Sequence, residues 1–107
     1  MRQLSAVELK AWLEDAQREH PLLLDVREPW EFERCHIDGA LPMPMSQFQS
    51  TFAQLDPDRE TVVICHHGVR SFHVARFLEH NGFENVINLT GGVDAWAKDV
   101  DPQMPVY

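Results

Sequence analysis

The stretch Thr61–Ser71, TVVICHHGVRS, places a cysteine directly between an apolar run and the start of an amphipathic segment. The β-branched run Thr61–Ile64 predicts a buried strand that ends at Cys65, and the apolar spacing in Phe72–Leu78 predicts a helix. The first backbone N–H groups of a helix lack partners within it, so they can point at the cysteine sulfur or at an anion beside it. Such a field favours a thiolate over a thiol. We therefore predict that Cys65 is a nucleophile; the alternative, a buried structural cysteine, requires none of these features.

The loop after Cys65 carries positive charge. Arg70 is permanently charged, whereas the charge of His66 and His67 depends on pH. Two functions are open for Arg70: contact with an anionic substrate, or an ion pair with a carboxylate such as Asp25 or Glu28 that holds the loop. Because the two histidines are adjacent, we expect their side chains to diverge, and no spacing typical of a zinc site is present. No metal site is predicted.

The rest of the chain alternates between predicted helices and strands. Ser5 and Glu8 have the spacing of a capping box, and the apolar positions from Leu9 to Ala16 fall on one face of a helix that His20-Pro21 ends. Further predicted strands are Leu22–Val26 and Asn85–Leu89, and further predicted helices are Ser46–Leu55, the Phe72–Leu78 segment capped by Asn81-Gly82, and Val93–Lys98.

This alternation predicts an α/β fold with a mostly parallel sheet. Asp25, Cys65 and Gly91 each follow a predicted strand. Because sites in such folds form at the carboxyl ends of the strands, we expect these three residues at one edge of the sheet.

Composition narrows the class of protein. The chain has 107 residues, of which 44% are hydrophobic, so we expect one domain, 1–107, with a substantial core. A formal net charge of −8 argues against nucleic-acid binding. Residues 1–8 contain no apolar run, so we expect a soluble cytoplasmic protein without membrane association, in which Cys35 and Cys65 are thiols.

Three blocks of sequence resemble the rhodanese (thiosulfate sulfurtransferase-like) family over nearly the whole chain. They are Leu24–Glu28 with Glu31-Phe32 and His36–Ala40; Cys65–Ser71; and Asn88–Trp96. The resemblance implies a roughly five-stranded, mainly parallel sheet with helices on both faces. The two strands that the pattern does not reveal would be short pieces near Gln3 and at either 35–37 or 41–43.

The resemblance also implies a function, namely sulfur transfer through a persulfide on Cys65. The donor would be thiosulfate or a similar sulfur-containing anion, and the acceptor cyanide, a thiol or a protein, with no cofactor required. The active-site loop would comprise His66, His67, Gly68, Val69, Arg70 and Ser71. Asp25 and Arg27 would support it by an ion pair, although they are also open to interpretation as an ordinary surface pair.

Two other functions are weighed against sulfur transfer. Phosphatases and arsenate reductases of this fold have five residues between the cysteine and the arginine, whereas four lie between Cys65 and Arg70. The shorter loop suits one sulfur atom better than a tetrahedral phosphate. A non-catalytic binding module is the second alternative, which the presence of Cys65 disfavours.

The roles of four other residues are less defined. Cys35 is either a thiol without a role or a resolving thiol for Cys65, and His36 is expected to hydrogen-bond within its turn. Trp30 and Phe32 lie among charged residues and would be available for docking a partner.

Overall fold

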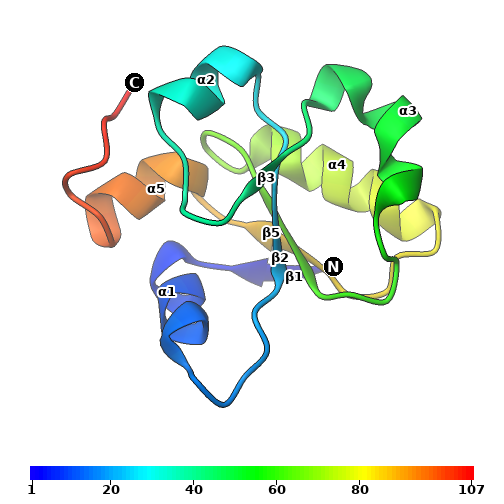
Figure 1. Cartoon of the computed structure of the whole chain (residues 1–107), viewed down its shortest axis with the longest axis horizontal. Coiled ribbons are helices and arrows are strands. Elements are labelled where there is room, and N and C mark those ends of the chain that lie inside the picture. The colour runs from blue at the N-terminus through cyan, green and yellow to red at the C-terminus, as the bar shows by residue number, and fades with distance from the viewer.

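The computed structural model, which describes residues 1–107, contains one five-stranded sheet with all strands parallel, in the order β1-β5-β4-β2-β3 (Figure 1). The strands are β1 (Arg2–Leu4), β2 (Leu22–Asp25), β3 (Leu41–Pro42), β4 (Thr61–Ile64) and β5 (Val86–Leu89). The helices are α1 (Ala6–Glu14), α2 (Pro29–Arg34), α3 (Phe48–Thr51), α4 (Val69–His80) and α5 (Gly92–Asp99), and 3₁₀ turns at Met45–Gln47 and Phe52–Gln54 flank α3.

The predicted α/β class and sheet are confirmed. β2, β4 and β5 coincide with the three strands that the apolar runs indicate. Of the two alternatives for a short strand, the structure forms the one at Leu41–Pro42 and leaves 35–37 irregular. β1 and β3 are too short for a sequence pattern to reveal, because two or three residues cannot display a period.

Helices cover both faces of the sheet. On one face, α1 and α5 pack Leu9, Trp12 and Trp96 against β4 and β5. On the other face, α3 and α4 pack Phe48 and Leu78 against β2 and β4 (Figure 1). The central strand β4 is completely buried and contributes side chains to both clusters. An apolar run without alternation is expected of a parallel strand covered on both faces.

Two helix predictions need correction, and one helix was not predicted. The capping box of Ser5 and Glu8 forms, but α1 ends at Glu14, before the Pro21 that was expected to end it. The segment Ser46–Leu55 is divided into 3₁₀ and α turns instead of forming one helix. α2 was not predicted, because half of its six residues are charged and it has too few apolar positions to show a period.

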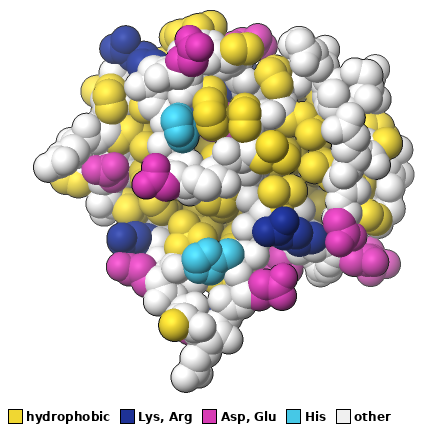
Figure 2. Space-filling model, in the orientation of Figure 1, with side chains coloured by type: hydrophobic (Ala, Val, Ile, Leu, Met, Phe, Trp, Pro, Cys, Tyr) yellow, Lys and Arg dark blue, Asp and Glu magenta, His cyan; other side chains and the backbone are white.

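Charged side chains are spread over the surface and do not form one patch on the face shown in Figure 2. Acidic side chains are spread over the face shown in Figure 2, and the basic side chains there stand apart from one another. None of the helices has the combination of length and apolarity needed to cross a lipid bilayer.

Candidate active site

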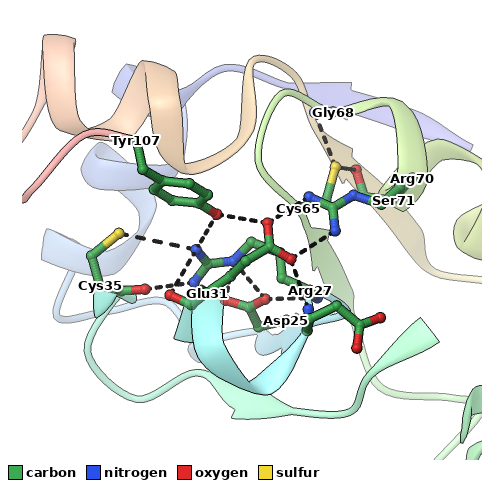
Figure 3. A network of polar contacts seen from close by, with 10 residues as sticks. Asp25, Arg27, Glu31, Cys35, Cys65, Gly68, Arg70, Ser71 and Tyr107 are labelled. Atoms are coloured by element: carbon green, nitrogen blue, oxygen red, sulfur yellow. Dashed lines mark hydrogen bonds and ion pairs between the residues drawn. The ribbon is translucent and has the colours of Figure 1, made fainter. Parts of the chain in front are cut away.

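The Cys65 side chain lies between the end of β4 and the start of α4 and is only 1% exposed. Its Sγ accepts a hydrogen bond from the Gly68 backbone N–H at 3.1 Å and lies 3.3 Å from Ser71 Oγ (Figure 3). Gly68 is the N-cap of α4 with φ of +99°, and a Cβ there would lie 3.1 Å from the Gly91 backbone nitrogen. The loop therefore needs glycine both for its turn and for its close approach to Gly91.

The turn between β5 and α5 holds the other side of the loop. The backbone N–H groups of Val93 and Asp94 donate to the carbonyl oxygens of Cys65 and His66, at 2.9 and 3.0 Å. Gly92 lies so close to these carbonyls that a Cβ would overlap both of them. This position therefore requires glycine, because any side chain would collide with the two carbonyl oxygens.

A buried polar chain connects the cysteine to β5. The Ser71 hydroxyl donates to Asn88 Oδ1, and Asn88 Nδ2 donates to the Gly68 carbonyl at 3.2 Å and to Gln3 Oε1 at 3.0 Å. Asn88 thus fixes both the loop and the residue beside the sulfur. Sequence reasoning missed it, although a lone asparagine in an apolar strand is itself a signal, since a buried amide needs partners.

Arg70 forms a bidentate ion pair with Glu31 of α2, with both N–O distances 2.8 Å (Figure 3). The prediction that the partner would be a carboxylate such as Asp25 or Glu28 named the wrong residues. Asp25 pairs with Arg27 instead, and Glu28 donates its backbone N–H to the Glu31 carboxylate at 2.8 Å. The Arg70 hydrogen bonds are the main reason that the pKa of Glu31 falls to about 2. The same pair raises the pKa of Arg70, with a smaller contribution from Cys65.

Asp25 and Arg27 form a buried ion pair, with side-chain exposures of 1% and 0%, so they are not a surface pair. Arg27 Nε and Nη2 donate to the two carboxylate oxygens at 2.9 and 2.8 Å, and the remaining donors reach the Cys35 carbonyl at 2.6 Å and Tyr107 Oη at 2.7 Å. Burial lowers the pKa of Arg27, but the hydrogen bonds with Asp25 and Tyr107 outweigh it and place the pKa above its ordinary value. A charge so buried is retained only with such complete pairing.

Tyr107 joins the two ion pairs. Its hydroxyl accepts from Arg27 and donates to Glu31 Oε1 at 3.0 Å. Its ring stacks on His66, with centroids 3.9 Å apart and planes 6° apart, and meets Trp30 edge to face at 5.7 Å. Burial is the main cause that raises its pKa to about 12, so the phenol is neutral. No sequence signal points to Tyr107, because the contacts come from chain folding back 76 residues beyond Glu31.

The prediction that the side chains of His66 and His67 diverge is wrong, because the two rings lie against each other. Their ring centroids lie 3.9 Å apart, with planes inclined by 32°. Loss of contact with water is the main cause that lowers the pKa of His66, and the charge of the neighbouring His67 lowers it further, so the neutral form is favoured. His67 Nε2 lies 3.9 Å from Asp94 Oδ2, which also accepts from Lys98 Nζ at 2.9 Å.

The less defined residues lie around α2. Cys35 is a buried thiol whose Sγ is 4.0 Å from Arg27 Nη1, and no disulfide is formed. His36 Nδ1 is 2.8 Å from the Phe32 carbonyl oxygen, as expected of a turn, and the two rings stack. Trp30 is 60% exposed, whereas Phe32 is half-buried by that stack, so of the two expected docking residues only Trp30 is freely presented.

Comparisons with known proteins identify similar sequences and structures. A family model described as "Rhodanese-like domain" matches residues 5–99. The chain is 42% identical over 90 residues to a rhodanese-like/PpiC domain-containing protein 12, chloroplastic, of Arabidopsis thaliana, covering 79% of this chain and 30% of that protein. It is 38% identical over 74 residues to thiosulfate sulfurtransferase GlpE of Shewanella oneidensis, covering 69% and 73%.

Among solved structures, a rhodanese-like domain protein from Staphylococcus aureus superposes with a TM-score of 0.85 at 27% identity, covering 100% of this chain and 99% of that one. The chain thus spans less than a third of the chloroplast relative's length but nearly all of the staphylococcal one.

Proposed function

The chain belongs to the rhodanese-like domain family, whose members include proteins named sulfurtransferases, and we propose that it transfers sulfane sulfur through a persulfide on Cys65. The observation that carries the proposal is the hydrogen bond from the Gly68 N–H to Cys65 Sγ at the start of α4. A donor aimed at the sulfur from a helix N-terminus stabilises negative charge there, both on a thiolate and on the terminal sulfur of a persulfide.

In the first step, the Cys65 thiolate attacks the outer sulfur of thiosulfate. The new S–S bond forms as the bond between that sulfur and the sulfonate breaks, so the protein gains one sulfur atom and sulfite leaves with the electron pair of the broken bond. The total charge is unchanged. The Gly68 N–H supplies a donor for the charge that develops on the sulfur atoms.

In the second step, an acceptor attacks the terminal sulfur of the persulfide and regenerates the Cys65 thiolate. Cyanide would become thiocyanate, and a thiolate on a small molecule or a protein would become a persulfide. Since the covalent intermediate separates the two half-reactions, ping-pong kinetics are expected. No cofactor is part of the proposal.

For Arg70 we favour the role of holding the loop over direct contact with the substrate anion. The bidentate pair with Glu31 supports this, because it occupies two donors of the guanidinium in a fixed geometry. Arg70 is still 37% exposed, so its charge contributes to attracting an anionic donor toward Cys65. The buried pair of Asp25 and Arg27 would support the loop through Tyr107 and Glu31.

Intact-protein mass spectrometry under non-reducing conditions tests the proposal. After incubation with thiosulfate, the wild type should gain about 32 Da, one sulfur atom, whereas Cys65→Ser should gain nothing. Cys35→Ser is the matched control and should gain the same mass as the wild type. Absence of the added sulfur from the wild type with every sulfane donor tested would favour the binding module instead.

A further inference from the structure

We propose that His66, His67 and Asp94 form a binding site for a divalent transition-metal ion of the Zn²⁺ type. Each of the three residues offers a ligand atom, and these atoms lie within 4.8 Å of one another. Two imidazole nitrogens and a carboxylate oxygen are a ligand set that zinc accepts, with water completing a tetrahedral arrangement. The proposal concerns a binding site beyond the sulfur chemistry and does not depend on it.

The spacing is close to that of a formed site. Ligands about 2.1 Å from a tetrahedral ion stand about 3.4 Å apart, so the atoms need to approach by little more than 1 Å. His67, with 62% of its side chain exposed, and Asp94, with 22%, have room to make this movement.

His66 has an unusual environment that metal binding would explain. Its Nε2 is the one buried side-chain nitrogen or oxygen without a hydrogen-bond partner among residues 1–107. Buried polar atoms are nearly always partnered, and an exception commonly marks the place of an ion or water. The ring is held between the rings of Tyr107 and His67, with centroids 3.9 Å from each, so its position is fixed by packing on both sides.

The backbone holds the ligands in place before any ion arrives. The Asp94 N–H donates to the His66 carbonyl at 3.0 Å, so the loop and α5 are joined beside the three side chains. The only competitor for the carboxylate is Lys98, which pairs with Oδ2 from an exposed position and leaves Oδ1 free. An exposed pair four residues apart on a helix is only weakly stabilising, so it would not prevent a zinc ion from binding the carboxylate.

Isothermal titration of the reduced protein with ZnCl₂ tests the site. One ion per chain should bind, and the His67→Ala and Asp94→Asn variants should each weaken the affinity at least tenfold. Matched controls are His73→Ala and Asp99→Asn, which remove an exposed histidine of α4 and an exposed acid of α5 and should bind as the wild type does. The same titration in Cys65→Ser should be unchanged, which separates this site from zinc binding by the thiol.

A second measurement guards against variants that fold poorly. In nitrogen-15 spectra of the imidazole rings, Zn²⁺ should shift the signals of His66 and His67 and leave those of His73 unchanged. Binding that survives both His67→Ala and Asp94→Asn, shifts spread over all histidines, or absence of binding in the wild type would each overturn the proposal.

Discussion

Replacing Glu31 by glutamine should reveal how strongly the carboxylate holds the active-site loop. The two oxygens of Glu31 accept four hydrogen bonds: two from Arg70, one from the Tyr107 hydroxyl and one from the Glu28 N–H. Glutamine keeps the shape but has one oxygen and no charge, so Glu31→Gln removes about half of these bonds.

The magnitude follows from the pKa of Glu31, which falls from 4.5 to about 2 on folding, with its side chain only 5% exposed. A shift of this size corresponds to about 3 kcal/mol of stability at neutral pH. Because Arg70 is 37% exposed and water can solvate it once it is freed, we expect Glu31→Gln to lower the free energy of unfolding by about 2 kcal/mol.

The effect should depend on pH in a defined direction. A carboxyl group whose pKa is lowered on folding stabilises the native state above its unfolded pKa, and this contribution is lost as the pH falls from about 4.5 toward 2. The difference between wild type and Glu31→Gln should therefore shrink to less than half between pH 7 and pH 3.

Urea unfolding followed by tryptophan fluorescence at several pH values measures this difference. Glu33→Gln is the matched control, since Glu33 lies on the same helix, is exposed and forms no ion pair; it should change stability by less than about 0.5 kcal/mol. A Glu31→Gln effect that equals the control, or that stays constant from pH 7 to pH 3, would refute the reasoning.

Two further predictions concern the residues around the loop. Gly92→Ala should destabilise the protein by more than about 2 kcal/mol and abolish persulfide formation, because its Cβ would lie 2.5 Å from the His66 carbonyl and closer still to that of Cys65. Tyr107→Phe should cost about 1 kcal/mol in urea unfolding and raise the pKa of Glu31, measured by carbon-13 titration of the carboxyl group, because the lost hydrogen bond helps to lower that pKa.

Gly39→Ala is the control for the glycine substitution. Gly39 also has positive φ, +85°, but nothing lies within 4 Å of the added Cβ. Gly39→Ala should therefore destabilise the protein through backbone strain alone. Equal losses of stability in Gly39→Ala and Gly92→Ala would show that the Cys65 and His66 carbonyl oxygens near Gly92 do not cause the effect. An unchanged titration of Glu31 in Tyr107→Phe would exclude the coupling through the hydroxyl.

The sequence by itself determined the α/β class, the three long strands and the place of Cys65 at the junction of β4 and α4. These features are local: an apolar run, a glycine and a helical period each express themselves within about ten residues. The topology of a parallel sheet then brings the ends of β2, β4 and β5 to one edge. That is why Asp25 and Cys65 could be expected there together.

Only the tertiary structure decided which side chains pair around that edge. The sequence offers several carboxylates as partners for Arg70. The partner is Glu31 because the short helix α2, which shows no sequence period, places its carboxylate beside the guanidinium. Tyr107 reaches the same carboxylate from 76 residues away, and Asp94 reaches His67 only because α5 packs against the loop. The choice of partner depends on distances of a few tenths of an ångström between elements far apart in the chain, and residue type and spacing do not encode those distances.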